Sequence, residues 1–371
     1  MGKLRVLVVE DSATVRAYLC SVLTADPDIE VIAEVDDGQK AVELCASMRP
    51  DVVTLDMMLP TMTGLAATEQ IMAYCPTPIL VVSSSFNRGE LFKTYEALAA
   101  GAVDVLEKPS GETDDADWNR RFIAAVRMVA RIRVITHPRA RLSALQGGKR
   151  EPTPAIVPPP PTFSSDSIAP RPNMQRRIEA VAVGASTGGP SAIVEVLKAL
   201  PDSFSLAILL VLHIGEPFGR SFAEWLSTQI GRPVAYALEG QSLFALTNRV
   251  CMAPPDQHLR IVAGRVRLDQ GPERHSCRPS IDVLFESLAQ ELRERVAACL
   301  LTGMGRDGAQ GLLALRQAGA MTIAQDEATS VVYGMPREAA RLNAAERILP
   351  LNEIGPSLSA LEAASNAWRS P

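Results

Sequence analysis

Short apolar runs alternate with helix-like segments along most of this chain, and the alternation occurs twice. Before residue 128 the runs are RVLVVE, DVVTLD, PILVVSS and AVDVLEKP; after residue 177 they are EAVAVGAS, LAILLVLH, RVCMAPP, ACLLTGMG and MTIAQDE. Short β-branched runs separated by amphipathic segments are typical of βαβ units around a buried parallel sheet. The pattern therefore predicts an α/β protein with two doubly wound parallel-sheet domains.

A proline-rich segment separates the two regions. Residues 137–177 hold nine of the 27 prolines, with seven basic residues against two acidic ones. This composition favours an extended, solvated linker with polyproline character, and a basic contact for an acidic partner is the second interpretation. We expect a first domain over residues 1–127, a helical end and Pro-rich basic linker over 128–177, a second domain over 178–355 and a C-terminal tail over 356–371.

Composition excludes several classes of function. The formal net charge is −5 and no dense basic stripe is present, so we expect no nucleic-acid partner. No apolar run approaches the roughly 18 residues of a membrane span, and the N-terminal run is too short for a signal peptide. Six cysteines lack zinc-like spacing, which favours structural thiols in a reducing compartment: Cys20, Cys45, Cys75, Cys251, Cys277 and Cys299. We expect a cytoplasmic protein with no membrane insertion.

Acidic residues follow two predicted strands of the first domain. The first strand ends in Glu10 and Asp11 and the third in Asp56, while the fourth ends in Ser83 and the fifth in Lys108. Ligands gather outside the carboxyl ends of parallel strands. Taken singly, each residue is most often a loop or cap residue. Together, three converging carboxylates favour a hard cation such as Mg²⁺, and the lysine and hydroxyl suit a phosphoryl group.

Over residues 3–127 the chain resembles a response-regulator receiver domain, a flavodoxin-like fold. The motifs are VLVVEDS, VVTLDMMLPTMTG, PILVVSS and EKPSG. The resemblance implies that Asp56 accepts phosphate from a histidine kinase and that Ser83 and Lys108 contact the phosphoryl group. It implies that four groups hold Mg²⁺: Glu10, Asp11, Asp56 and the backbone carbonyl of Met58. Val105 stands where that family usually has an aromatic switch residue, which puts the usual rotamer switch in doubt.

The second domain opens with a glycine-rich turn, Gly184-Ala-Ser186-Thr-Gly188. It matches the G-x-S-x-G nucleophile elbow, and its glycines equally suit a phosphate-binding loop. A dinucleotide site predicts an acidic residue at the end of the next strand, but that strand ends in His213. Because a serine nucleophile needs a base, the position of His213 favours catalysis over cofactor binding.

Ser186, His213 and Asp307 form the candidate catalytic set. Of the four histidines only His213 directly ends a predicted buried strand; the others are His137, His258 and His275. Asp307 lies in a glycine-rich turn after ACLLTGMG and could orient the imidazole, although an aspartate that caps the next helix is also common there. The order Ser, His, Asp excludes a standard α/β-hydrolase that uses this aspartate.

From about Glu179 to Leu349 the chain resembles the catalytic domain of the chemotaxis protein-glutamate methylesterase (CheB) family. The matching text is VGASTGGP, APPDQHL, RPSIDVLFESLA, LTGMGRDGA and AQDEATSVVYGMPREA. The resemblance implies a Rossmann-like catalytic domain that hydrolyses glutamate γ-methyl esters on methyl-accepting chemoreceptors and deamidates receptor glutamines. No cofactor is implied for the esterase reaction. We expect the backbone N–H groups near Thr187 and Met304 to form the oxyanion hole.

Two departures from that family concern loops. IGEPFG follows His213 in place of a Met-Pro continuation, and APPD replaces APGG or APGD. Neither alters the candidate triad, so we expect altered loop shape and receptor choice.

Three other functions compete with this one: a hydrolase of small-molecule esters, a phosphorylation-gated binding module with a vestigial triad, and nucleotide binding at the glycine turn. In the favoured hypothesis the first domain covers the active site of the second until Asp56 is phosphorylated.

Overall fold

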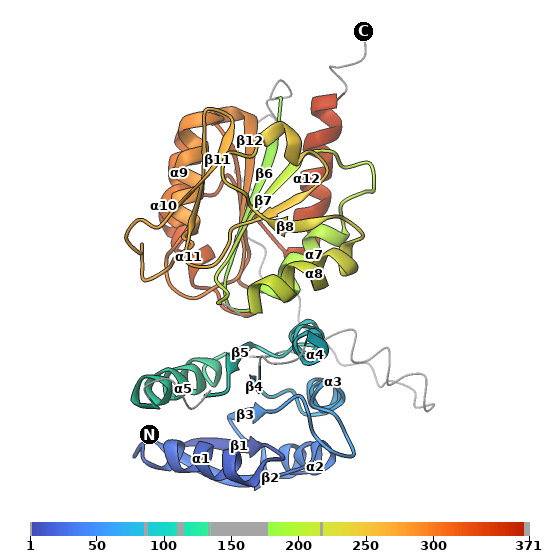
Figure 1. Cartoon of the computed structure of the whole chain (residues 1–371), viewed down its shortest axis with the longest axis vertical. Helices are drawn as coiled ribbons and strands as arrows, with labels where there is room; N and C mark the ends of the chain where they lie inside the picture. Colours follow the sequence, from blue (N-terminus) through green and yellow to red (C-terminus); the bar gives the residue numbers. More distant parts are fainter. Residues whose placement is uncertain are drawn as a thin grey trace, which may run out of the picture.

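The N-terminal domain is a five-stranded parallel sheet in the order β2-β1-β3-β4-β5 (Figure 1). The computed structural model describes residues 2–84, 88–109, 115–132, 134, 177–215 and 218–366. The strands are β1 (Leu4–Val9), β2 (Ile29–Val35), β3 (Val52–Leu55), β4 (Ile79–Ser83) and β5 (Asp104–Glu107). The helices are α1 (Ala13–Thr24), α2 (Gly38–Met48), α3 (Gly64–Tyr74), α4 (Arg88–Ala99) and α5 (Asp115–Val129).

This strand order is the flavodoxin-like one, with its switch point between β1 and β3. Both faces are covered: Leu19 and Phe122, from α1 and α5, pack on one side, while Ile71 and Leu98, from α3 and α4, pack on the other. Buried β-branched runs such as β3 are therefore shielded from water on both sides.

The C-terminal domain is a seven-stranded parallel sheet in the order β14-β13-β12-β6-β7-β9-β8. Its strands are β6 (Ala180–Ala185), β7 (Ala207–Leu212), β8 (Val234–Tyr236), β9 (Val250–Met252), β12 (Val296–Leu300), β13 (Met321–Gln325) and β14 (Arg347–Leu349). A separate antiparallel hairpin joins β10 (His258–Val262) and β11 (Arg265–Asp269).

Helices cover both faces of this second sheet. One face carries α7 (Gly189–Lys198), α8 (Phe218–Ile230) and α12 (Leu351–Asn366), and the other carries α9 (Ile281–Glu291), α10 (Ala309–Gln317) and α11 (Met335–Arg341). Short 3₁₀ helices span Leu243–Leu246 and Arg293–Arg295. The prediction of two doubly wound parallel-sheet domains is confirmed.

The C-terminal boundary that we expected divides a helix. A tail was expected from residue 356, but α12 runs through this point, and Leu358 and Glu362 are buried. Glu362 accepts hydrogen bonds from the N–H and hydroxyl of Ser205, at 2.6 and 2.7 Å, which ties the helix to the domain. We therefore propose that the second domain extends through α12. Most of the expected linker, and the end of the tail, lie outside the described residues.

The two domains meet along α4. This helix packs on α7 and α8, and Figure 1 shows it between the two sheets. Tyr95 of α4 is fully buried, and its hydroxyl donates a hydrogen bond to the carbonyl of Phe218. Its ring lies 5.5 Å from that of Phe222 and 5.4 Å from that of Trp225, between ring centroids. No helix in the described parts of the chain is long and apolar enough to span a membrane.

Candidate active site

The three candidate catalytic residues follow three adjacent strands. Ser186 comes directly after β6, His213 directly after β7, and Asp307 lies in the loop after β12. Strand β6 lies between β7 and β12 in the sheet. After β6 the chain first adds β7 on one side, and it adds β12 on the other side later in the sequence. Such a reversal of strand order is the usual position of a site in an open α/β sheet.

The turn that carries Ser186 depends on close backbone packing. The Ser186 N–H donates to the carbonyl of Thr302 at 3.0 Å, and Gly188 adopts a positive φ of 74°. A Cβ on Gly303 would lie 2.8 Å from that of Ser186, so only glycine lets the loop after β12 approach the nucleophile. The hydroxyl is thereby set at the sheet edge on a half-buried residue.

His213 contacts Asp307 through Nε2. Its Nε2 lies 2.9 Å from Asp307 Oδ2, and its Nδ1 lies 3.7 Å from the sulfur of Cys277. Burial opposes protonation of the ring, but the contacts with Asp307 and Cys277 outweigh it and raise the pKa of His213 to about 9. Among the described contacts there is no hydrogen bond between Ser186 and His213; catalytic hydrogen bonds of this kind often form only when substrate binds.

Asp307 is buried at the N-terminus of α9. Its carboxylate accepts hydrogen bonds from the Ser280 hydroxyl (2.7 Å) and from the N–H groups of Ile281 (2.7 Å) and Asp282 (3.2 Å). Burial alone would raise its pKa, but the bonds from His213, Ser280 and Ile281 hold the pKa below its usual value. The positive end of the helix dipole acts in the same direction. Asp307 is therefore ionised, which the orienting role predicted for it requires.

Thr302 joins the three loops around Ser186. Its fully buried hydroxyl lies 3.0 Å from the carbonyl of Thr187 and accepts from Val332 N–H at 2.9 Å, and its own N–H donates to Gln325 at 2.8 Å. Within the described residues, neither the N–H of Thr187 nor that of Met304 has a hydrogen-bond acceptor. Both are therefore available to an oxyanion, although the role itself remains a prediction.

Sequence reasoning missed the residues that hold the triad. Ser280 and Thr302 lie within RPSIDVLFESLA and LTGMGRDGA, motifs that carry the family resemblance without assigning these two residues a role. Ser280 caps α9, and a serine directly before an apolar helix-like run could have predicted this cap from the sequence. Cys277 carried no signal that separates it from the other five cysteines.

The other histidines have different surroundings. His258 is buried, and its Nδ1 accepts a hydrogen bond from the N–H of Ser280. His275 lies 3.2 Å from Asp282 through Nε2, and its Nδ1 accepts from Arg306. Both shape the loop beside the site, and among the described contacts neither makes a hydrogen bond to Asp307. His137 lies outside the described residues.

A second cluster lies at the switch point of the N-terminal sheet. Lys108 Nζ lies 2.8 Å from Glu10 and 3.0 Å from Asp56, and both carboxylates are buried. Burial raises the pKa of Glu10 to about 7; Lys108 opposes this shift and the charge of Asp56 adds to it. Burial also raises the pKa of Asp56, with Lys108 opposing. One lysine does not compensate the charge of this cluster.

These carboxylates fit a divalent cation. Oxygen atoms of Glu10, Asp11 and Asp56 lie within 4.8 Å of one another. Within the described residues, Glu10 Oε2 is buried with the Lys108 ammonium beside it but no well-directed hydrogen bond. Hard oxygen donors are the ligands that Mg²⁺ prefers. Met58 follows in the same loop, where its backbone N–H faces Asp56; its carbonyl as a fourth ligand remains a prediction.

Ser83 is directed away from this cluster. Its hydroxyl donates to Glu90 of α4 at 2.9 Å and accepts from Thr94 at 3.2 Å. The contact of Ser83 with a phosphoryl group therefore stays a prediction, and it requires the hydroxyl to leave Glu90. A buried hydroxyl takes the nearest strong acceptor, and Glu90 supplies a carboxylate in the first turn of α4.

Comparisons with known proteins identify the family of each domain. Residues 181–358 match the family model described as CheB methylesterase, and residues 6–115 match the response regulator receiver domain. A protein-glutamate methylesterase/protein-glutamine glutaminase of Syntrophus aciditrophicus is 39% identical over 95% of this chain and 96% of its own length. The chain belongs to the CheB family of protein-glutamate methylesterases. A relative with the same description in Cupriavidus metallidurans is 40% identical over 96% of this chain and 97% of its own length.

Two solved structures from Thermotoga maritima are similar to parts of the chain. The CheB methylesterase catalytic domain is 31% identical, with a TM-score of 0.47, and covers 50% of this chain and 98% of its own. The response regulator domain of CheB is 34% identical, with a TM-score of 0.32, and covers 35% of this chain and 98% of its own.

The receiver domain contacts the residue next to the candidate nucleophile. Asp104, at the start of β5, lies 3.5 Å from the hydroxyl of Thr187. Burial raises the pKa of Asp104 to about 6, while the N–H of Val105 and the hydroxyl of Thr187 oppose this shift. The methylesterase domain thus meets an acidic receiver residue beside its candidate oxyanion hole.

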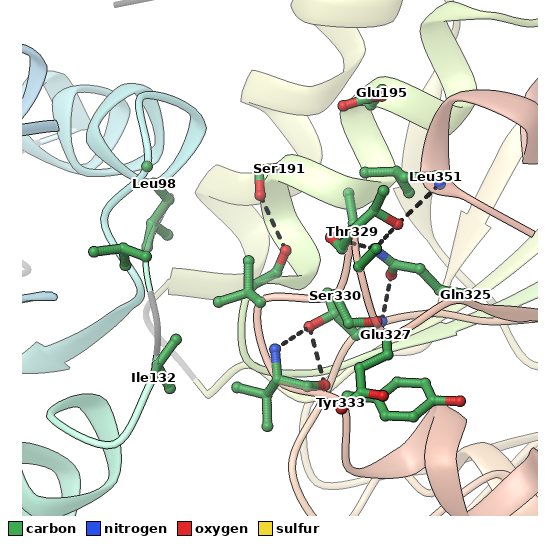
Figure 2. A pocket seen from close by; sticks show the side chains of 18 of the residues that line it. Leu98, Ile132, Ser191, Glu195, Gln325, Glu327, Thr329, Ser330, Tyr333 and Leu351 are labelled. Carbon is green, nitrogen blue, oxygen red and sulfur yellow. Dashed lines mark hydrogen bonds between the residues drawn. The ribbon is translucent and has the colours of Figure 1, made fainter. Parts of the chain in front are cut away.

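A cavity of about 800 Å³ lies between the two domains. Figure 2 shows Leu98 and Ile132 of the receiver facing Ser191, Thr329 and Tyr333 across it. Its wall also includes three residues of the loops around Ser186: Gly188, Thr302 and Met304. The receiver therefore forms one wall of the space in front of the methylesterase loops.

Proposed function

We propose that this chain is a phosphorylation-activated serine hydrolase that removes methyl groups from glutamate γ-methyl esters on chemoreceptors, releases methanol and deamidates receptor glutamines. The observation that carries the proposal is the contact of Asp307 with His213 at the strand end beside Ser186. The relatives that share the whole architecture are described as having both activities. Cytoplasmic receptor helices are the proposed substrate, and a chemotaxis histidine kinase is the proposed phosphodonor.

In this mechanism His213 acts through Nδ1. Because Asp307 accepts a hydrogen bond at Nε2, the lone pair of the neutral ring lies on Nδ1, which takes the proton of Ser186 as its Oγ attacks the ester carbonyl. The N–H groups of Thr187 and Met304 would stabilise the oxyanion, each by about 3 kcal/mol. The imidazolium then returns its proton to the leaving methanol, or to ammonia from a glutamine, and water hydrolyses the acyl-enzyme.

Activation would begin at Asp56. Glu10, Asp11, Asp56 and the carbonyl of Met58 would hold Mg²⁺, which neutralises charge on an incoming phosphoryl group. Lys108 would pair with that group, and Ser83 would turn from Glu90 to meet it. The contact of Asp104 with Thr187 supports a receiver that restricts the active site until this change occurs.

The test is methanol release from methylated receptor membranes, with and without acetyl phosphate. We expect wild-type release to rise with acetyl phosphate, and Ser186→Ala to lower it by at least about 10³-fold. Ser359→Ala is the matched control, because the hydroxyl of Ser359 donates to a carbonyl within α12, away from the triad.

Asp56→Asn should keep basal release and lose the phosphodonor response. Ammonia release from receptors with glutamine at the same sites tests deamidation. Equal release by Ser186→Ala and wild type would refute the proposal.

A further inference from the structure

Cys277 lies on the side of His213 that Asp307 leaves open. Its Sγ is 3.7 Å from Nδ1, and the residue is partly exposed. Two ion pairs hold the loop that carries it: Arg274 contacts Glu286 at 2.5 Å, and Arg278 contacts Asp256 at 2.6 Å. Arg274 and Cys277 also exchange backbone hydrogen bonds of 3.1 and 3.0 Å. The thiol is therefore positioned by the fold.

A cysteine sulfur and an imidazole nitrogen are both common ligands of zinc. A zinc ion binds thiolate at about 2.3 Å and imidazole nitrogen at about 2.0 Å, which places the two donors of a tetrahedral site about 3.6 Å apart. The observed separation of Sγ and Nδ1 is 3.7 Å. A metal that replaced the thiol proton would therefore need almost no movement of either side chain.

Asp307 contacts the other nitrogen of His213 and would not bind the metal itself. Its Oδ1 accepts from Ser280 and Asp282, and its Oδ2 accepts from His213 and Ile281, so neither oxygen is free for a metal. A carboxylate behind a ligating histidine fixes the tautomer and raises the basicity of the other nitrogen. His213 keeps 15% of its side-chain surface exposed, which leaves a path from solvent.

We propose that Cys277 Sγ and His213 Nδ1 bind Zn²⁺, and that the metal reversibly inhibits the methylesterase. The inhibition rests on the proposed function, because the metal would occupy the nitrogen that takes the proton of Ser186. Two protein ligands leave positions for water, so the site differs from a closed structural zinc site and releases its metal to a chelator.

Binding is measured without substrate. The reduced, metal-free full chain is titrated with Cd²⁺, a soft stand-in for Zn²⁺ whose bond to thiolate gives an ultraviolet charge-transfer band. We expect the band in wild type and in Cys75→Ser, whose partly exposed thiol lies in the receiver. Cys277→Ser and His213→Gln should each lose it or need at least about tenfold more Cd²⁺. A band that persists unchanged in Cys277→Ser overturns the proposal, as does one that disappears only in Cys75→Ser.

Inhibition is then measured as methanol release with added Zn²⁺. Wild type should lose at least about tenfold in rate at saturating Zn²⁺ and recover when a chelator selective for zinc over magnesium is added. Cys277→Ser, compared with its own metal-free rate, should need at least about tenfold more Zn²⁺ for half-inhibition. Equal sensitivity of the two proteins overturns the inhibition. If no receptor preparation yields methanol, the Cd²⁺ titration still decides whether the site exists.

Discussion

His213 presents its two ring nitrogens to different partners, and this assignment determines the chemistry of the site. Asp307 occupies Nε2, so Nδ1 is the nitrogen that we propose takes the proton of Ser186. The pKa of His213 is raised to about 9, since its bonds to Asp307 and Cys277 outweigh the effect of burial. A ring that is protonated near neutral pH cannot take a proton, so the fraction of active base depends steeply on pH.

Wild-type activity should therefore rise with pH through an inflection at about 9 and level off only above it, because only the neutral ring is a base. Asp307→Asn removes the carboxylate that raises the pKa, so the inflection should move toward the usual histidine value while the rate falls by about 10³- to 10⁴-fold. The measurement is methanol release against pH for receptors without phosphodonor. An Asp307→Asn profile with an unmoved inflection would contradict the assignment of His213.

Thr302→Val should reduce both stability and rate. It leaves the N–H of Val332 without its acceptor inside the protein, at a cost of about 1–3 kcal/mol in unfolding free energy. The loop that carries Thr187 also loses a hydrogen bond, so we expect methanol release to fall by about tenfold. Denaturant unfolding and methanol release are measured together. Thr302→Ser keeps the hydroxyl and is the control; if it behaves like Thr302→Val, the hydroxyl is not the cause.

The candidate triad was predictable because each member follows a recognisable apolar strand. Parallel strands end at one sheet edge, so the order of the apolar runs is enough to place Ser186, His213 and Asp307 there. Cys277 and Thr302 could not be predicted, because their positions depend on how loops far apart in the chain pack together. The hydrogen bond of Ser83 could not be predicted for a similar reason, because its acceptor Glu90 lies on a separate helix; its contact with a phosphoryl group stays a prediction.

Helix α4 connects the receiver site to the domain boundary. Glu90, in its first turn, accepts hydrogen bonds from Ser83 and from the N–H of Ser84, both at 2.9 Å. Tyr95, one turn further on, packs against α8. Val105 is not aromatic, so we expect a change at Ser83 to reach the methylesterase domain through α4.

Glu90→Gln should make the enzyme more sensitive to phosphodonor. A neutral amide holds the Ser83 hydroxyl less tightly than a carboxylate, by about 1 kcal/mol, which frees Ser83 for the phosphoryl group. We expect the acetyl phosphate concentration for half-maximal methanol release to fall by about fivefold, with the maximal rate unchanged. Glu69→Gln, an exposed position on α3, is the control. An unchanged half-maximal concentration in Glu90→Gln would show that Glu90 does not restrain Ser83.

The interior strands of both sheets were predictable, and the two edge strands of the C-terminal sheet were not. Buried β-branched runs such as those of β6 and β7 identify central strands from sequence alone. Strands β8 and β14 lie at the sheet edges and are only partly buried, so neither presents a buried apolar run in the sequence. The hairpin of β10 and β11 packs on α9, where Ile261 N–H donates to Ser287 at 3.0 Å, a long-range contact that local sequence does not reveal.

The receiver as a whole lies against the methylesterase domain on the side of the loop that carries Thr187. It forms one wall of the cavity in front of the loops that hold Ser186, and it brings Asp104 to Thr187. Deleting residues 1–137 should therefore raise methanol release without phosphodonor and abolish the response to acetyl phosphate. Circular dichroism checks that the truncated chain is folded. A folded truncation with an unchanged or lower rate would contradict masking.

Docking of the receiver should weaken as pH rises. Burial raises the pKa of Asp104 to about 6. The part of this burial that the methylesterase domain supplies makes the docked state bind the proton more tightly than the undocked state. The stabilisation of docking is complete below pH 3.8 and is lost as pH rises through about 6. At that pH a carboxylate forms whose donors, among the residues that the structure describes, are Val105 N–H and the Thr187 hydroxyl.

Asp104→Asn should remove this dependence and leave the receiver docked. The measured quantity is the rate of full-length wild type divided by the rate of the truncated chain, a ratio that cancels the titration of His213. This ratio should rise between pH values of about 5 and about 7. The same ratio for Asp104→Asn should stay low and flat across this range. Asp51→Asn is the control, since Asp51 is an exposed receiver aspartate that accepts a hydrogen bond from Arg5 N–H, away from the boundary. A ratio that rises equally in Asp104→Asn and wild type would show that another group controls docking.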